Sequence, residues 1–150
     1  MEHDNLINTQ DEFLDETKYV MIIDDNPAIT SLYNRLARTG YKTDVYDDPL
    51  KIREAELRKY PVFIIDYNMI NMCGDELIPV IQEKNGFAYL IVYTGFPSID
   101  KYETLKKLNL LGVDFWAEKG DKKMVDEMFV RLDYAFRRLE NIFSPLHLNK

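Results

Sequence analysis

Short apolar runs recur along the chain, and each is followed by a segment with helical spacing. Three of them read YVMII (Tyr19–Ile23), PVFIID (61–66) and AYLIVYT (88–94). A strand that is apolar on both faces must be buried on both faces, as in a parallel sheet between helices. Strands that alternate with helices through short connections form right-handed crossovers. These runs therefore predict an α/β fold with helices on both faces of a parallel sheet.

The full pattern contains five strand–helix units in one domain. The expected strands lie at residues 19–23, 42–46, 61–66, 88–94 and 113–117. The expected helices begin near residues 29, 49, 75, 102 and 122, and the last continues to Phe143 before Pro145. The second has a weaker pattern and is expected to run from Pro49 to Lys59, and Tyr33 and Tyr102 are expected on apolar helix faces. We interpret residues 1–17 as an N-terminal arm, 18–143 as the domain and 144–150 as a C-terminal tail.

Charge and composition exclude several classes of function. The net charge is -7, whereas a nucleic-acid surface needs an excess of Lys and Arg. One cysteine cannot form a disulfide within the chain, which favours a reducing compartment. The first residues lack the apolar core of a signal peptide, and no apolar run approaches the ~20 residues of a membrane span. We therefore expect a cytoplasmic protein whose partners are proteins or cations.

Reactive side chains stand where the inner strands end. Asp24 and Asp25 follow the first strand, Asp66 ends the third, Thr94 ends the fourth and Lys119 follows the fifth. The carboxyl ends of parallel strands share one edge of the sheet, so these side chains should lie together. Clustered carboxylates raise each other's pKa, and a hard divalent cation such as Mg²⁺ relieves that repulsion. The pattern predicts a magnesium site.

The same cluster can hold a phosphoryl group. An ammonium and a hydroxyl donate to phosphoryl oxygens, and a carboxylate can attack phosphorus to form an aspartyl phosphate. The simpler alternative is that Asp25 or Asn26 caps a helix that begins at Pro27. A cap explains one acidic or amide residue, but it leaves Asp24 unexplained.

These residues also carry a resemblance to a known family. The segments IIDDN, IIDYNMINMCG, IVYTG and GVDFWAEKG resemble the motifs of response-regulator receiver domains, which are CheY-like partners of histidine kinases. The resemblance covers about residues 18–136. It implies a flavodoxin-like, doubly wound (βα)5 fold with strand order 2-1-3-4-5, extended in this chain by a long C-terminal helix.

The resemblance assigns the acceptor and the metal ligands. It implies that Asp66 receives the phosphoryl group from a sensor histidine kinase or a histidine phosphotransfer protein. It also implies that Asp25, Asp66 and the backbone carbonyl of Asn68 bind Mg²⁺ directly, while Asp24 acts mainly through water. The chain would then be a stand-alone phosphoprotein of a two-component phosphorelay, and it would catalyse only its own phosphorylation and dephosphorylation.

Other positions are assigned to switching and to the lifetime of the phosphoryl group. By resemblance, Thr94 and Lys119 contact phosphoryl oxygens, and Trp116 takes the place of the aromatic residue that moves on activation. Asn68 and Phe96 stand at positions that tune the lifetime. Since an aromatic ring at Phe96 can block an attacking water, we expect slow self-dephosphorylation.

Two residues depart from the family pattern. Ile70 stands where the family commonly has proline, and Gly120 follows the lysine where the family usually has a cis proline. A cis bond before a residue other than proline costs about 2.5–4 kcal/mol, which favours a trans bond at Lys119-Gly120. The position of the Lys119 ammonium is therefore open, although its presence is not.

The last helix has a wider apolar stripe than one core face needs. Apolar residues recur at intervals of seven in three rows: Val125, Leu132, Leu139 and Leu146; Met128, Ala135 and Ile142; Phe129, Phe136 and Phe143. We expect Leu139, Ile142 and Phe143 to extend beyond the sheet, under the N-terminal arm or in a homodimer. About 30 residues follow Lys119, which is too few for an output domain. A downstream protein is therefore expected to contact the face of the fourth helix, fifth strand and fifth helix.

Two alternative functions remain open on the sequence. One is an interaction module of the same fold that works without phosphorylation, which Gly120 favours and the complete acidic set disfavours. The other is a Mg²⁺-dependent phosphatase that works through an aspartyl phosphate. Such enzymes prefer a second aspartate at the position of Asn26, and no segment is available for a substrate cap.

Overall fold

The fold is known from a computed structural model that describes residues 18–95 and 101–143, with backbone only for 140–143. The strands are β1 (Tyr19–Ile23), β2 (Lys42–Tyr46), β3 (Val62–Ile65), β4 (Tyr89–Thr94) and β5 (Phe115–Glu118). The α-helices are α2 (Thr30–Arg38), α3 (Glu54–Lys59), α4 (Gly74–Lys84), α5 (Lys101–Leu111) and α6 (Lys122–Phe143), with short 3-10 turns at Pro27–Ile29 and Pro49–Lys51. The N-terminal arm, Phe96 and the C-terminal tail lie outside the described residues.

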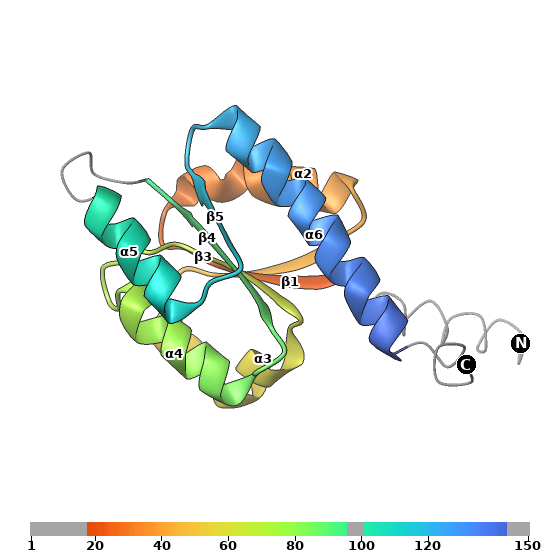
Figure 1. Ribbon diagram of the computed structural model, residues 1–150, viewed down its shortest axis with the longest axis horizontal. Coiled ribbons are helices and arrows are strands. Elements are labelled where there is room, and N and C mark those ends of the chain that lie inside the picture. The colour runs from red at the N-terminus through yellow and green to blue at the C-terminus, as the bar shows by residue number, and fades with distance from the viewer. Residues whose placement is uncertain (1–17, 96–100, 144–150) are drawn as a thin grey trace, which may run out of the picture.

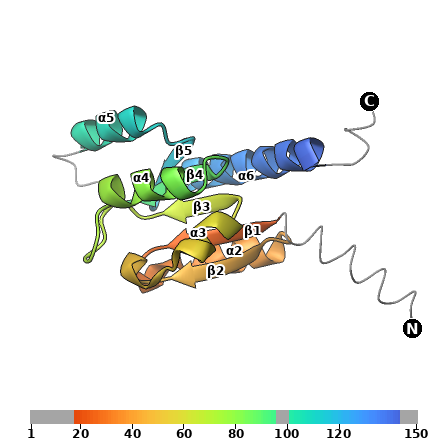
Figure 2. The same cartoon turned by 90° about the horizontal axis from the view of Figure 1, so that it is seen from below.

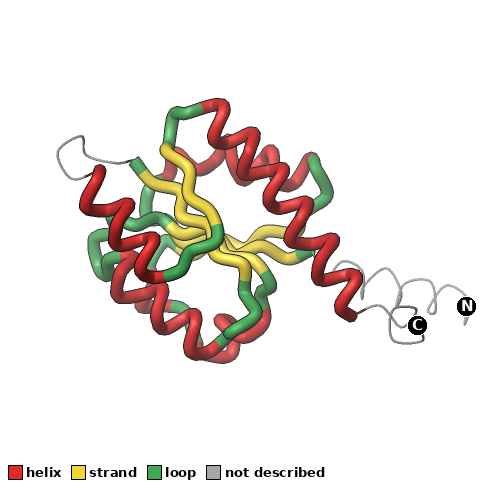
Figure 3. The backbone as a smooth tube through the Cα atoms, in the orientation of Figure 1, coloured by secondary structure: helices red, strands yellow, loops and turns green. Residues whose placement is uncertain are grey.

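The sheet is parallel throughout and is covered by helices on both faces. Its five strands follow the order β2-β1-β3-β4-β5. Helices α2 and α6 pack on one face, and α3, α4 and α5 pack on the other (Figures 1 and 2). The backbone trace shows the strands lying between these two layers (Figure 3). The prediction of a doubly wound fold with this strand order is confirmed.

Alternation along each central strand builds two separate cores. In β1, Val20 and Ile22 join the core under α2 and α6, whereas Met21 and Ile23 join the core under α3, α4 and α5. Strand β3 divides in the same way and is buried along its whole length. This double burial is the physical reason for its uninterrupted apolar sequence. The polar side chains that follow these strands are therefore held at the edge of a fully packed layer.

The second predicted helix is interrupted. The chain forms a short 3-10 turn at Pro49–Lys51, which is capped by the Asp48 carboxylate, and it is extended at Ile52 and Arg53 before α3 begins. Ile52 packs against the core of α3, α4 and α5, whereas Leu50 is exposed. A continuous helix would have placed Leu50 and Leu57 on the same face, so the prediction of one helix at 49–59 is wrong.

Three predicted side-chain positions also need correction. Tyr102 is 70% exposed and Tyr33 is 40% exposed, so neither lies on a buried helix face. Leu139 was expected to extend beyond the sheet, but it is buried in the core with Phe136. The side chains of Ile142 and Phe143, which were predicted to extend with it, lie outside the described residues.

Gly74 begins α4 at a point where the chain leaves no room for a side chain. A Cβ atom there would lie 2.8 Å from Cδ2 and 3.0 Å from Cα of Tyr67. We expect Gly74→Ala to lower the unfolding free energy by about 1–3 kcal/mol, because the backbone of residue 67 must move. Urea unfolding measures this. The matched control is Gly86→Ala, where the nearest atom would lie 3.9 Å away and little change is expected. Equal effects of the two substitutions would contradict this reading of the turn.

None of the helices among residues 18–95 and 101–143 is both long enough and apolar enough to cross a bilayer.

Candidate functional site

Asp66 lies at the carboxyl end of β3, on the edge of the sheet where the strand-end residues meet. It is 5% exposed, and its backbone N–H donates to the carbonyl of Ile23 on β1 at 2.9 Å. The Thr94 hydroxyl donates to Asp66 Oδ1 at 2.6 Å, and Asp66 Oδ2 lies 3.6 Å from Lys119 Nζ. The carboxylate therefore has a hydroxyl on one oxygen and an ammonium near the other.

The two acidic residues that follow β1 have different partners. Asp24 is buried, its Oδ2 lies 2.7 Å from Lys119 Nζ, and its Oδ1 accepts from the Asn26 N–H at 2.9 Å. Its own N–H donates to the carbonyl of Tyr46 on β2. Asp25 is half-buried, and its Oδ2 accepts from the backbone N–H of Ile70 at 2.9 Å. Asn26, and not Asp25, caps the turn that starts at Pro27.

The three carboxylates form a donor set that fits a hard divalent cation. Asp24, Asp25 and Asp66 each offer one oxygen, and these oxygens all lie within 4.8 Å of one another. Burial raises the pKa of Asp24, and the charge of Asp66 raises it further, while hydrogen bonds from Lys119 and the Asn26 amide oppose the rise. A cation among these oxygens would favour the ionised form. All-oxygen ligation suits Mg²⁺ or Ca²⁺ better than a soft metal.

Lys119 leaves the sheet at the same edge as Asp66. Its backbone N–H donates to the carbonyl of Thr94 at 2.9 Å, which continues the pairing of β5 with β4. No cis peptide bond occurs among the described residues, and Gly120 has φ +89°. The chain therefore turns at Gly120 into Asp121, whose side chain accepts from the N–H of Met124 in α6. The trans bond at Lys119-Gly120 is the one expected from the cost of a cis bond before a residue other than proline.

The other predicted residues are Asn68, Trp116 and Phe96. Asn68 is exposed, and its backbone N–H donates to Asp66 Oδ1 at 3.4 Å. Trp116 lies next to Val92 in the strand register, and its half-buried side chain packs in the core of α3, α4 and α5. The structure therefore brings Asp24, Asp25, Asp66, Thr94 and Lys119 into one cluster, and it pairs Trp116 with Val92, two residues before Thr94. Phe96 is outside the described residues, so its predicted role stays a prediction.

Sequence reasoning did not predict two contacts of this cluster. The Ile70 N–H reaches Asp25, and the Lys119 ammonium lies over the ring of Tyr93, 5.8 Å from its centroid. Ile70 had been noted only for replacing proline, and its side chain is 92% exposed. A backbone N–H leaves no sequence signal. An aromatic residue immediately before Thr94 was a weak signal for the second contact.

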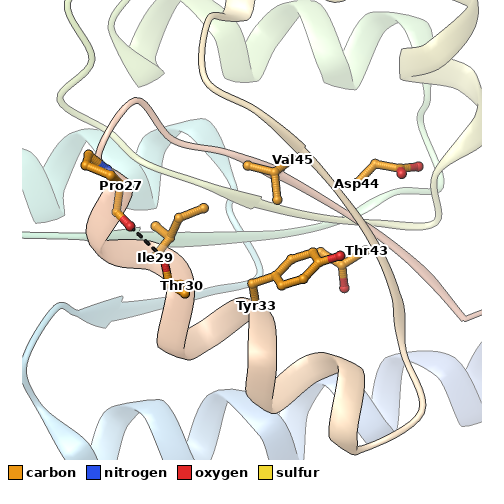
Figure 4. A pocket seen from close by; sticks show the side chains of 7 residues that line it. All are labelled: Pro27, Ile29, Thr30, Tyr33, Thr43, Asp44 and Val45. Atoms are coloured by element: carbon orange, nitrogen blue, oxygen red, sulfur yellow. Dashed lines mark hydrogen bonds between the residues drawn. The ribbon is translucent and has the colours of Figure 1, made fainter.

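A hollow in the surface lies apart from this cluster. It has a volume of about 560 Å³ between α2 and the edge strand β2 (Figure 4). Its lining is mostly apolar and contains none of the clustered carboxylates: Pro27, Ile29, Thr30, Tyr33, Thr43, Asp44 and Val45. Because it has neither the ammonium nor the acidic set, we assign the chemistry to the strand-end cluster.

Binding of Mg²⁺ to the cluster should be visible as added stability. At one hundred times the dissociation constant, we expect Mg²⁺ to raise the unfolding free energy by about 2.7 kcal/mol, because only the folded chain holds the three oxygens together. The measurement is urea unfolding with and without Mg²⁺. Asp25→Asn should remove most of the increase while the amide oxygen can still accept from Ile70. An increase of the same size with Na⁺ at equal ionic strength would show general screening instead of a site.

Comparison with solved structures identifies the fold. No model of a protein family matches the chain, and no curated protein matches it. The receiver domain of NtrC4 from Aquifex aeolicus is 28% identical, with 80% of this chain and 97% of that chain covered and a TM-score of 0.64. A CheY-like response regulator receiver domain protein from Methanospirillum hungatei JF-1 is 20% identical, with 81% and 98% covered and a TM-score of 0.65.

A chemotaxis protein has the same fold. CheY4 of Vibrio cholerae is 22% identical to this chain, with 76% of this chain and 97% of that chain covered and a TM-score of 0.63. These likenesses span almost the whole length of each matched structure. They show that the chain folds as a CheY-like receiver domain, which confirms the resemblance that its motifs predicted.

Proposed function

We propose that this chain, which has the fold of response-regulator receiver domains, accepts a phosphoryl group on Asp66 from a phosphohistidine, with Mg²⁺ as cofactor. The observation that carries the proposal is the placement of Asp66. Its carboxylate lies at the edge of the sheet with a hydroxyl on one oxygen, an ammonium near the other and two further carboxylates close by. This set contains a nucleophile, donors for phosphoryl oxygens and ligands for a cation.

The transfer exchanges one bond to phosphorus for another. A carboxylate oxygen of Asp66 forms the new P–O bond, the P–N bond to the donor breaks, and its electron pair stays on the imidazole nitrogen. The transition state is loose, so the protein contributes mainly by positioning groups and neutralising charge. Mg²⁺, when bound, would neutralise charge on phosphoryl oxygens. Asp24, Asp25 and the carbonyl of Asn68 are its proposed ligands with Asp66.

Thr94 and Lys119 are proposed to bind the transferred group. The Thr94 hydroxyl donates to Asp66 before transfer, and that acceptor oxygen changes when the carboxylate becomes an acyl phosphate. The hydroxyl is then free to donate to a phosphoryl oxygen. Lys119 Nζ lies 3.6 Å from Asp66 Oδ2, so the ammonium can pair with another phosphoryl oxygen. A shift of Thr94, followed by Trp116 in the neighbouring strand, is the proposed switch.

The proposed output surface is the face formed by α5, β5 and α6. On α5, Tyr102 and Leu110 are exposed, and on α6 Val130 and Tyr134 are exposed. Exposed aromatic and aliphatic side chains on neighbouring elements suit a protein contact. A downstream protein or a second copy would bind there, and the chain would act only on its own phosphorylation state.

The two alternative functions lack comparable support. A module that works without phosphorylation does not explain why Asp66 is buried or why Thr94 and Lys119 lie close to its carboxylate. A phosphatase would need a second aspartate at position 26, where Asn26 instead caps the turn at Pro27–Ile29. Turnover of a phosphate ester would favour the phosphatase.

The test is incubation of the protein with acetyl phosphate and Mg²⁺, followed by intact mass and peptide mapping. We expect the mass of one phosphoryl group on the peptide that contains Asp66. Fluoroberyllate with Mg²⁺ should change the fluorescence of Trp116 under the same conditions. A folded protein that gains no mass and shows no fluorescence change would overturn the proposal.

A further inference from the structure

The ammonium of Lys119 lies between a carboxylate and an aromatic ring. Its Nζ is 2.7 Å from Asp24 Oδ2 and 5.8 Å from the centroid of the Tyr93 ring. The Lys119 side chain is 21% exposed, so much of it is removed from water. An ammonium within about 6 Å of a ring centroid is attracted to the ring, and desolvation strengthens that attraction.

The backbone does little to direct this side chain. Lys119 is held to Thr94 through its own N–H, but the next residue is Gly120 in the left-handed region with φ +89°. A lysine carries its charge on a flexible four-carbon stem. Contacts made by the ammonium must therefore decide where it lies.

The carboxylate contacts of the ammonium belong to the candidate metal site. Asp24 is in the acidic set, and a cation bound there would weaken its attraction for Lys119, because part of the carboxylate charge would be neutralised. The ring of Tyr93 is outside that set and would keep its attraction. Asp66, whose Oδ2 lies 3.6 Å from the ammonium, belongs to the same acidic set. Of the three groups around the ammonium, only the ring is therefore independent of the cation.

Tyr93 is itself held in place by packing. It immediately precedes Thr94 in β4, so its side chain is on the opposite face of the sheet, where it packs against the core of α2 and α6. Its half-buried ring is a rigid surface at the edge where Lys119 emerges. Of these two neighbouring residues of β4, Thr94 therefore contacts Asp66, and Tyr93 contacts the ammonium of Lys119.

We propose that Tyr93 is a positioning residue whose ring holds the Lys119 ammonium beside Asp66 while a cation occupies the acidic set. The inference rests on the proposed function for its effect on rate, but the placement of Lys119 can be measured independently of it. Removal of the ring should leave the ammonium free to move away from the carboxylate and so slow phosphoryl uptake.

The placement is tested by NMR of the unphosphorylated protein. The Hε protons of Lys119 should be shifted upfield by the ring, both with and without Mg²⁺. Tyr93→Phe should keep the shift, and Tyr93→Leu should remove it. The matched control is Tyr89→Leu, which removes a ring from the same strand and the same face at the end remote from Lys119. Unshifted protons in the wild type, or a shift that survives in Tyr93→Leu, would overturn the placement.

The consequence is tested by the rate of phosphoryl uptake from acetyl phosphate at saturating Mg²⁺. We expect Tyr93→Leu to be about five-fold slower than the wild type, and Tyr93→Phe and Tyr89→Leu to be within two-fold of it. Loss of fold stability alone would slow both leucine variants. Wild-type rates in Tyr93→Leu, or equal slowing in Tyr93→Phe, would overturn the role of the ring. If the wild type takes up no phosphoryl group, the rate effect falls with the proposed function, and the NMR shift still decides the placement.

Discussion

Replacing Asp66 by Asn is expected to abolish phosphoryl uptake from acetyl phosphate and Mg²⁺ while the protein stays folded. The amide is not a competent nucleophile toward phosphorus, so no P–O bond forms. The amide oxygen can still accept from the Thr94 hydroxyl, which now donates to Asp66 Oδ1. The substitution also removes one of three clustered carboxylates, so the unfolding free energy should not fall. Intact mass measures the uptake, and urea unfolding measures the stability.

The control for this substitution is Asp47→Asn, at an exposed aspartate just after β2. It makes the same change of charge and mass, and it should leave phosphoryl uptake at the wild-type rate. Uptake by the Asp66→Asn protein at a rate near that of the wild type would mean that another residue is the acceptor. Uptake lost in both variants would indicate a general effect of charge.

Replacing Lys119 by Met is expected to lower the unfolding free energy of the metal-free protein by about 3 kcal/mol, the lower end of the range for a broken buried ion pair. The Asp24 side chain is only 2% exposed and has Lys119 at 2.7 Å. Without the ammonium, the carboxylate must either stay charged without a counterion or take up a proton. Urea unfolding without Mg²⁺ measures the loss.

Mg²⁺ should restore more stability to this variant than it adds to the wild type. The cation supplies the positive charge that the lysine no longer provides, and it no longer competes with the ammonium for Asp24. The control is Lys106→Met, which removes a surface lysine 3.9 Å from Glu103 and should change stability by less than about 1 kcal/mol. A Lys119→Met protein as stable as the wild type without Mg²⁺ would show that Asp24 does not depend on this partner.

The positions of the strand-end residues could be predicted from the sequence because two independent constraints agree. Apolar runs such as the one before Asp66 must be buried on both faces, which requires a parallel sheet. A parallel sheet in turn places the residues after its strands at one edge. Asp24, Asp25, Thr94 and Lys119 followed from the same reasoning, because it needs only where each strand ends.

Side-chain direction could not be predicted in the same way. Lys119 was expected to contact a phosphoryl group, and the ion pair with Asp24 depends on the rotamers of a long, flexible side chain. The prediction of a helix at 49–59 was wrong for a related reason. Its apolar spacing was weak, and the packing of the partly buried Ile52 against the core outweighed the local preference for helix. Tyr102 shows that an apolar residue at helical spacing can also face solvent.

The backbone hydrogen bonds of Asp24 and Asp66 have a consequence for how the molecule comes apart. Their amides donate to Tyr46 on β2 and to Ile23 on β1, so both residues belong to the ladders of the central strands. Amide protons in such ladders exchange with solvent only when the cooperative unit that contains them opens. An outer helix such as α5 can therefore detach and return while both carboxylates remain in place. Slow deuterium uptake at residues 24 and 66 would mark this edge of the sheet as one of the last parts of the chain to open.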